Sequence, residues 1–250
     1  MTRSDRVAVW LRERATAASA RGFILGMSGG IDSAVVARLC QKAMPGGVLG
    51  VIMPCHSHPG DELDAIAAAE ASGLPTVRVD LSSAYDAITL DITAASAAAA
   101  ESGFPADPAR TKIALANVKP RLRMTTLYTI GTASGLLVTG TGNKSEITIG
   151  YYTKYGDGGV DLLPIGALVK SEVRELAREL DVPAQIVDKP PSAGLWAGQT
   201  DEGEMGFTYG DLERYINGGA SAVEADTAAR IQRLAAASDH KRALPPLGPR

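Results

Sequence analysis

Short runs of apolar and β-branched residues alternate with longer amphipathic segments along most of the chain. The short runs lie at residues 23–25, 48–53, 76–81 and 136–138, each beside glycine or proline. Runs of this length and composition are typical of buried strands. The segments around them carry apolar residues at helical spacing, as in Val173, Leu176, Ala177 and Leu180. They predict helices at residues 2–20, 31–43, 61–71, 84–101, 111–133 and 170–180.

Strands that alternate with helices predict an α/β fold, a doubly wound parallel sheet with helices on both faces. We expect one domain over residues 1–250, with ligands bound beyond the carboxyl ends of the strands at the switch point of the sheet. Residues 102–110 and 188–207 show no regular pattern and are predicted loops, the second of them mobile. We expect 102–111 and 190–207 to close over a ligand. Pro120 is expected to bend the helix at 111–133, and the final ALPPLGPR is not helical.

Composition narrows the class of protein. The 250 residues are 45% hydrophobic and 21% charged, which is typical of a soluble globular protein. Lys and Arg number 25 against 28 Asp and Glu, a net charge of −3 that argues against a nucleic-acid binder. No apolar run is long enough for a membrane span, so we expect no membrane partner. Cys40 and Cys55 lack disulfide or zinc-site spacing, which indicates packing roles in a reducing, cytoplasmic compartment.

The strongest chemical signal is the segment GMSGGIDS at residues 26–33, between the first strand and the next helix. Its glycines let backbone N–H groups approach an anion, and the helix start adds partial positive charge. Ser28 and Ser33 could donate to phosphate oxygens, beside which Asp32 suits a magnesium ion. The segment is neither a Walker A loop nor a dinucleotide fingerprint. Without its context, it could also be a helix N-cap.

This segment resembles the SGGxDS fingerprint of the PP-loop, or N-type, ATP pyrophosphatases. Further segments resemble NAD synthetases, and together they cover about residues 20–245. They are NVKPRLRM at 117–124, VTGTGNKSEITIGYYTKYGDGGVDLLPIG at 138–166, KPPSAGL at 189–195, GQTDE at 198–202 and HKR at 240–242. The resemblance implies an adenine nucleotide alpha hydrolase-like fold. It also implies ATP-dependent amidation of deamido-NAD to NAD through an adenylated carboxylate, with release of AMP and pyrophosphate.

The resemblance also implies roles for individual residues. Lys170 would offset the charge that grows on pyrophosphate, although a lysine at a helix start is more often solvated. The implied catalytic residues are Asp32, Glu146, Lys170 and Asp161, and the implied Mg²⁺ ligands are Asp32 and Glu146. The implied ATP-binding residues are Gly26, Met27, Ser28, Gly29, Gly30, Ile31, Asp32, Ser33, Thr141, Lys170 and Ser192. The implied deamido-NAD-binding residues are Arg121, Lys154, Asp161, His240 and Lys241.

The resemblance extends to partners and assembly. Free ammonia is the expected nitrogen donor, because a glutaminase would need roughly another whole domain. A homodimer is expected, with the C-terminal tail at about 239–250 closing over the site. Two departures stand out: Ile31 replaces a frequent glutamine, and Pro120 replaces a usual alanine beside Arg121. Lys119 and Arg123, near it, could equally be solvated surface residues.

Two other functions stay open from the residues alone. One is another PP-loop adenylating enzyme, such as a tRNA-modifying thiolase or a lysidine-type ligase. The net charge of −3 and the segment 151–161 argue against it, since RNA binding favours basic surface. The other is a non-catalytic module that binds adenine nucleotides. The presence of both Asp32 and Glu146 argues against that reading.

Overall fold

The computed structural model describes residues 1–189 and 200–249. Its centre is a parallel four-stranded sheet with the order β3-β2-β1-β4. The strands are β1 (Gly22–Met27), β2 (Val48–Ile52), β3 (Thr76–Arg78) and β4 (Leu136–Val138). β1 lies in the middle and pairs with both β2 and β4. The predicted doubly wound parallel sheet is therefore confirmed, although β3 ends at Arg78 rather than at Leu81.

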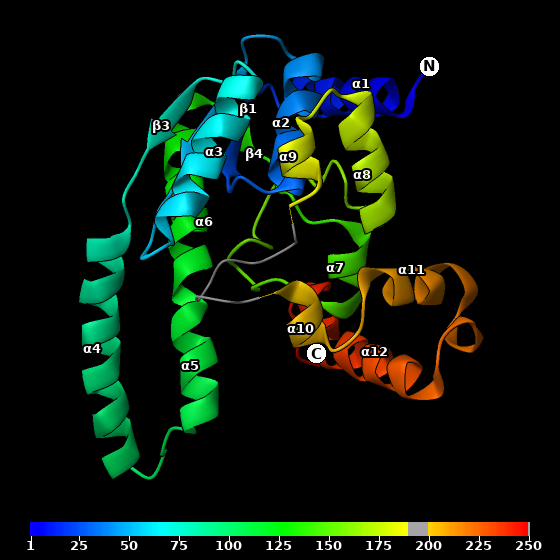
Figure 1. The fold of residues 1–250 in the computed structure, drawn as a ribbon. Helices are drawn as coiled ribbons and strands as arrows, with labels where there is room; N and C mark the ends of the chain where they lie inside the picture. The colour runs from blue at the N-terminus through cyan, green and yellow to red at the C-terminus, as the bar shows by residue number, and fades with distance from the viewer. Residues whose placement is uncertain (190–199, 250) are drawn as a thin grey trace.

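Helices cover both faces of this sheet, because side chains of β1 alternate between two cores. Phe23, Leu25 and Met27 pack into one core, and Ile24 packs into the other. The first face carries α1 (Arg3–Ala17), α2 (Ile31–Ala43), α3 (Pro59–Ala71), α8 (Lys170–Glu179) and α9 (Ala184–Val187). The second face is covered mainly by α6 (Val118–Ser134), and Figure 1 shows the two layers.

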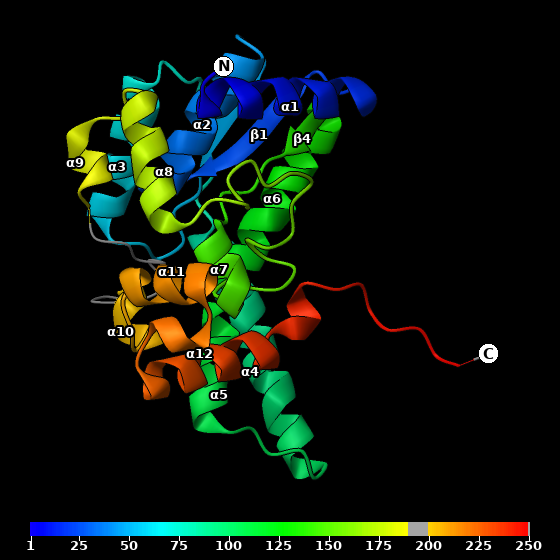
Figure 2. The ribbon, with the colours of Figure 1, turned by 90° about the vertical axis from the view of Figure 1, so that its right-hand side faces the viewer.

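Two helices form an arm that extends beyond the sheet. They are α4 (Ser82–Glu101) and α5 (Pro108–Ala116), and neither contains a buried residue (Figures 1 and 2). The predicted loop at 102–110 is too long, because Asp107 caps α5 through the backbone N–H groups of Ala109 and Arg110. Proline at the first helical position, as Pro108 is, favours that start.

The predicted helix at 111–133 is interrupted, but not at Pro120 as expected. The break between α5 and α6 falls at Asn117, and Pro120 lies in the first turn of α6. There a missing N–H breaks no intrahelical hydrogen bond, so the proline is tolerated.

The C-terminal part forms a small third core over α7 (Lys144–Ile149). Ile149 packs there with Met205, Phe207, Leu212 and Ile231. The last four residues lie on or next to three helices, α10 (Asp201–Met205), α11 (Tyr209–Gly218) and α12 (Ala225–Ala237). Two short 3₁₀ helices follow α11 and α12, at Ala220–Ala222 and Asp239–Lys241. The prediction of a loop over 188–207 is therefore wrong where α10 forms, at Asp201–Met205. Residues 190–199 of the predicted loop lie outside the described residues.

The end of α12 and the residues after it close the carboxyl end of α7. Gly150 ends α7 with φ +68°, and a Cβ there would lie 2.1 Å from Cβ of Ser238. The Nζ atom of Lys241 donates to the carbonyls of Gly150 and Tyr152, each at 2.6 Å, and Arg242 donates to the carbonyl of Ile147. Beyond Arg242 the tail runs away from the helices (Figure 2).

The two cysteines fit the packing roles expected for them. Cys40 and Cys55 are both free and buried. Burial raises the pKa of the Cys40 thiol to about 12 and raises that of Cys55 as well. Across the described residues, no helix is both long and apolar enough to cross a membrane.

Candidate active site

A cavity of about 760 Å³ opens at the carboxyl ends of the strands. Met27 at the end of β1, Met53 just after β2 and Thr139 just after β4 all line it. It therefore lies where the order of the sheet reverses around β1, as expected for a doubly wound sheet. The predicted ATP residues that line this cavity are Gly26, Met27, Ser28, Gly30, Ile31, Asp32, Thr141 and Lys170.

The predicted phosphate loop joins β1 to α2 and is held by its two serines. The Ser33 hydroxyl donates to the carbonyl of Gly30 at 2.9 Å and lies 3.2 Å from the Ser28 hydroxyl. Gly30 is the N-cap residue of α2 and has no side-chain cap, so its end of the helix is open to an anion. Ser33 is buried and holds the loop in shape, whereas Ser28 is exposed to the cavity.

Gly29 is the residue of this loop for which glycine is required. Its φ of +75° is a left-handed conformation, and a Cβ there would lie 2.6 Å from Cβ of Asp64 and 2.7 Å from its carbonyl carbon. The loop therefore packs directly on the backbone of α3. Gly29 shapes the loop and does not line the cavity.

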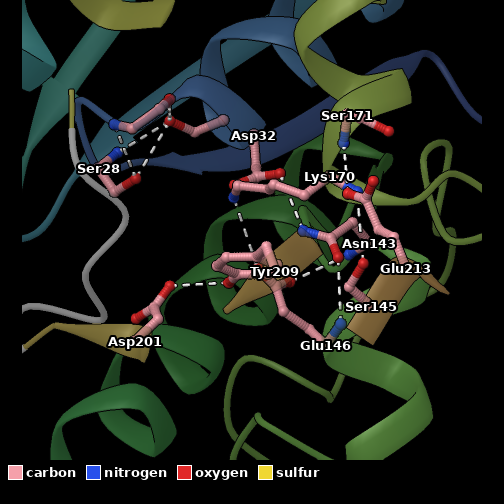
Figure 3. Close-up of polar contacts among 12 residues, drawn as sticks. Ser28, Asp32, Asn143, Ser145, Glu146, Lys170, Ser171, Asp201, Tyr209 and Glu213 are labelled. Carbon is pink, nitrogen blue, oxygen red and sulfur yellow. Dashed lines mark hydrogen bonds and ion pairs between the residues drawn. The ribbon is translucent and has the colours of Figure 1, made fainter. Parts of the chain in front are cut away.

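The centre of the site is an ion cluster of Lys170, Asp32 and Glu146 (Figure 3). The Nζ atom of Lys170 lies 2.5 Å from Oδ2 of Asp32 and 3.8 Å from Oε1 of Glu146. Lys170 is only 2% exposed, so it is not the solvated lysine that is more common at a helix start. Burial disfavours its charge, but the two carboxylates outweigh that effect and raise its pKa.

Asn143 links the two carboxylates, and the sequence interpretation did not assign it a role. Its Nδ2 atom donates to Oδ1 of Asp32 at 3.2 Å, and its backbone N–H donates to Oε2 of Glu146 at 3.1 Å. Its Oδ1 atom accepts from the backbone N–H of Glu146, which completes a capping box at the start of α7. The pattern Asn143-x-x-Glu146 is the signal that could have revealed it.

The two carboxylates form a donor set that fits Mg²⁺. This ion takes one or two carboxylates and completes its shell with water and phosphate oxygens. Burial and the charge of Asp32 raise the pKa of Glu146, which a nearby divalent cation would oppose. Within residues 1–189 and 200–249, no group of three or more Asp, Glu, His or Cys side chains could hold a metal ion. Oxygens from nucleotide phosphates would therefore be needed to complete the shell.

Three of the predicted substrate residues meet on another wall of the cavity. The Nζ atom of Lys154 donates to the carbonyl of His240 at 2.6 Å, and Arg121 reaches the carbonyl of Lys154 at 3.4 Å. All three line the cavity, and so does Lys241, although its ammonium group is bonded to two carbonyls at the end of α7. This wall presents positive charge suited to an anionic substrate.

Among the described residues, three predicted ones do not line the cavity: Gly29 and Ser33, which shape the phosphate loop, and Asp161. Asp161 is exposed on the far side of β4, where it accepts from the Tyr128 hydroxyl at 3.0 Å and the backbone N–H of Val138 at 2.8 Å. It does not line the cavity. Ser192 lies outside the described residues.

Several cavity residues were not predicted from the sequence. Arg123, treated as a candidate surface residue, instead lines the cavity and donates to the carbonyl of Met53 at 3.2 Å. Lys119, its neighbour in that interpretation, is buried at 8% exposure. Asp201 and Glu204 on α10 also line the cavity. The segment GQTDE at 198–202 was part of the resemblance, but no function was assigned to Asp201 or Glu204, and the fold was needed to place these carboxylates at the cavity.

The chain is similar to known proteins of one family over nearly its whole length. The NAD synthase family model matches residues 4–245. The NH(3)-dependent NAD(+) synthetase of Carboxydothermus hydrogenoformans is 50% identical over 244 residues, which are 97% of this chain and 95% of the relative. The corresponding enzyme of Syntrophomonas wolfei is 44% identical over 95% of this chain and 92% of its own.

Solved structures are similar over the whole length. The NMN synthetase of Francisella tularensis has a TM-score of 0.86 and 37% identity, covering 99% of this chain and 97% of that one. The NH3-dependent NAD synthetase of Campylobacter jejuni has a TM-score of 0.78 and 27% identity, with the same coverage. With this family match and these levels of identity, the chain belongs to the NAD synthase family.

Proposed function

We propose that this protein is an ammonia-dependent NAD(+) synthetase, which amidates deamido-NAD to NAD with ATP. The observation that carries this proposal is the cluster of Lys170, Asp32 and Glu146 between two walls of one cavity. One wall is the loop at Ser28, suited to a triphosphate. The other carries Arg121, Lys154 and His240, suited to an anionic dinucleotide. The sequences of the relatives named NH(3)-dependent NAD(+) synthetase support the same reaction.

The residues of the chain act mainly by positioning two anions and reducing their repulsion. The loop at Ser28–Ser33 holds the departing pyrophosphate, while the substrate carboxylate attacks the α-phosphate. A carboxylate is a poor acyl donor, and adenylation provides AMP as the leaving group. Ammonia then attacks the acyl carbon and forms the amide. Lys170 places its positive charge where negative charge grows on the phosphates.

Mg²⁺ would be held by Asp32 and Glu146 and would neutralise charge on the phosphate oxygens. Lys170 lies against both carboxylates, so it would keep them close to each other. Asn143 would fix their orientation through its bonds to both side chains. The functions of all these site residues are predictions, as are those of Asp161 and Ser192.

The test is to supply purified protein with deamido-NAD, ATP, Mg²⁺ and ammonium chloride, and to detect NAD, AMP and pyrophosphate by mass. Glutamine replaces ammonium in a parallel reaction, and we expect product with ammonium alone. Equal rates with glutamine alone would contradict an ammonia-dependent enzyme. ATP–pyrophosphate exchange that needs tRNA instead of deamido-NAD would support the RNA-modifying alternative, which the relatives do not favour.

A second substrate deserves the same assay, because the Francisella relative is named an NMN synthetase. Amidation of nicotinate mononucleotide uses the same chemistry on a substrate without the adenylate half. The value of kcat/KM is measured for each substrate, and the ratio of the two values shows which substrate the enzyme prefers. We expect the ratio to favour deamido-NAD, because the 50% identical relative is named an NAD(+) synthetase.

A homodimer built through the arm completes the proposal. The arm exposes large apolar side chains that a second copy could cover: Leu90 is 72% exposed, Phe104 76% and Ile113 58%. The acidic residues of α4 and the basic residues of α5 would pair across a two-fold axis. The C-terminal tail at about 239–250 would close over a site on binding. The two unpaired cysteines support a reducing, cytoplasmic location.

A further inference from the structure

Helix α11 contacts the first turn of α8 at two points, next to the predicted catalytic lysine. The Oε1 atom of Glu213 accepts from the backbone N–H of Ser171 at 2.7 Å. The ring of Tyr209 lies against the side chain of Lys170, whose Nζ atom is 5.2 Å from the ring centre. Residues four apart on a helix share a face, so one face of α11 contacts both the backbone and the ammonium group at this point (Figure 3).

The start of α8 is an unfavourable place for a buried cation. Lys170 is the first residue of α8 and is 2% exposed. A helix start carries partial positive charge, because its first backbone N–H groups lack partners within the helix. The preceding residue, Val169, has no side-chain acceptor for them. Glu213 supplies an acceptor from another helix, and its negative charge offsets the positive charge at this helix start.

Tyr209 is itself fixed at both ends of its side chain. It is 3% exposed, and its hydroxyl donates to Oδ2 of Asp201 at 2.9 Å. Burial raises the pKa of Tyr209, so the hydroxyl keeps its proton and this hydrogen bond. The ring therefore holds one position against Lys170. An ammonium group within about 6 Å of an aromatic centre is attracted to the ring face, most strongly where water is excluded.

The ring differs from the other two partners of Lys170. Asp32 and Glu146 attract its ammonium group through carboxylate oxygens, which accept hydrogen bonds in particular directions. The ring attracts the charge through its electron-rich face, so its effect depends little on where the N–H bonds point. Lys170 can therefore turn its N–H groups from the carboxylates to phosphate oxygens while the ring keeps the ammonium group in the site.

We propose that Tyr209 and Glu213 are positioning residues for Lys170 during adenylation. Neither of these two described residues lines the cavity, so both act through Lys170 and not by contact with a substrate. Tyr209 fixes the place of the ammonium group, and Glu213 fixes the backbone from which the side chain extends. The inference rests on the proposed function, in which Lys170 offsets charge on the phosphates.

The first experiment compares three variants in the full reaction. Tyr209→Leu removes the ring, Tyr209→Phe keeps the ring without its hydroxyl, and Phe207→Leu removes another buried ring of the same core. We expect kcat to fall about tenfold in Tyr209→Leu with little change in the KM for ATP, a factor in the range of a desolvated cation–π contact. The losses in Tyr209→Phe and Phe207→Leu should be much smaller. If either of these two variants loses as much kcat as Tyr209→Leu, the proposed function of the ring is wrong.

A graded series tests the charge on the ring face, and it remains available if Tyr209→Leu fails to fold. Phenylalanine analogues with increasing numbers of fluorine atoms are introduced at position 209 by amber suppression. Fluorine withdraws electrons from the ring face and changes the shape of the ring little, so the attraction for a cation weakens stepwise. We expect kcat to fall with each added fluorine. A flat series would show that the ring only fills space.

Glu213 is tested by variants that keep or remove its hydrogen bond. Glu213→Gln keeps an acceptor for the N–H of Ser171, and Glu213→Ala removes it. Glu224→Ala is the control, because it removes an exposed carboxylate from the same part of the chain. We expect kcat to fall severalfold in Glu213→Ala, to recover largely in Glu213→Gln and to be unchanged in Glu224→Ala. Unchanged kcat in Glu213→Ala would exclude the positioning function of Glu213.

A further measurement does not depend on activity. Thermal melts of Tyr209→Leu, Lys170→Met and the double variant, without ligands, form a double-mutant cycle. If the ring attracts the ammonium group, Tyr209→Leu should lower Tm less in the Lys170→Met background than in the unmodified protein. Equal shifts of Tm in the two backgrounds would contradict the contact. Absence of amide formation by the unmodified protein would instead reject the proposed function, so the two failures are distinguishable.

Discussion

The Nζ atom of Lys170 lies 2.5 Å from Oδ2 of Asp32, across 138 residues of sequence. This ion pair joins the first turn of α8 to the first turn of α2, beside the predicted phosphate loop. Because Glu146 is within 3.8 Å of the same ammonium group, one lysine offsets two carboxylates. The predictions below begin with this arrangement.

Lys170→Met should disable adenylation more than binding of the nucleotide. The variant keeps the length of the side chain but removes the positive charge that acts on the phosphates. We expect kcat to fall roughly 10²–10³-fold, as when one electrostatic donor is removed from an active site. Loss of the buried cation should also lower stability by about 3–5 kcal/mol. Lys170→Arg tests the charge alone, and steady-state rates with thermal melts measure both effects. Unchanged kcat in Lys170→Met would exclude a catalytic function.

Glu146→Gln should change how stability depends on pH. Burial and Asp32 raise the pKa of Glu146 to about 8, above its ordinary value of 4.5. Between these values the folded state binds more protons than the unfolded state, so the stability of the native protein falls as pH rises. As pH rises from 5 to 8, the unfolding free energy of Glu146→Gln should fall less than that of the unmodified protein.

Denaturant unfolding at several pH values measures this difference in slope. Saturating ATP and Mg²⁺ should reduce it, because a bound divalent cation favours the charged carboxylate. Parallel pH profiles for the two proteins would show that Glu146 titrates as an ordinary carboxyl group.

Gly29→Ala should weaken both the fold and nucleotide binding. The left-handed backbone costs alanine roughly 1–2 kcal/mol, and its Cβ would also meet Asp64 at 2.6 Å. Gly46→Ala is the matched control, because Gly46 has φ +78° with nothing within 4 Å of the added Cβ. We expect the unfolding free energy to fall further in Gly29→Ala than in Gly46→Ala, and the KM for ATP to rise in the first variant alone. Equal losses of unfolding free energy in the two variants would mean that α3 moves enough to make room for the Cβ added at residue 29.

Leu90→Asp combined with Ile113→Asp should prevent dimerisation through the arm. Both side chains are largely exposed, at 72% and 58%, so their replacement should leave the fold of the subunit unchanged. Charges placed in the centre of an apolar interface are strongly unfavourable. Analytical ultracentrifugation should show a monomer for this variant. The control is Leu244→Asp, a change at a 90% exposed residue of the tail, and it should show a dimer. A dimer in both would place the interface elsewhere.

The sequence alone predicts the sheet, and most of the residues that it assigns to the site line the cavity. Strand β1, the glycine loop and Asp32 form one local segment, so their arrangement follows from the order of residues. Glu146 and Lys170 start helices, where their side chains can reach a common point. Their direct pairing depends on how α7 and α8 pack together, which no local pattern specifies.

The missed features have identifiable causes. Asp107-Pro108 and Asn143-x-x-Glu146 are helix-start patterns that were not used, and they would have located α5 and the function of Asn143. The capping box of Thr208 and Asp211 likewise begins α11. Asp201 is different, because its burial and its bond to the Tyr209 hydroxyl arise only when the third core forms.

The residues after α12 tie the C-terminal core to the helix that carries Glu146. Ser238, Lys241 and Arg242 donate to the carbonyl groups of Ile149, Gly150 and Ile147, at the opposite end of α7 from Glu146. Carbonyl groups at a helix end need such donors when water does not reach them. Substitutions in this short segment would therefore act on the cluster of Lys170, Asp32 and Glu146 through the backbone of α7, without touching any of its side chains.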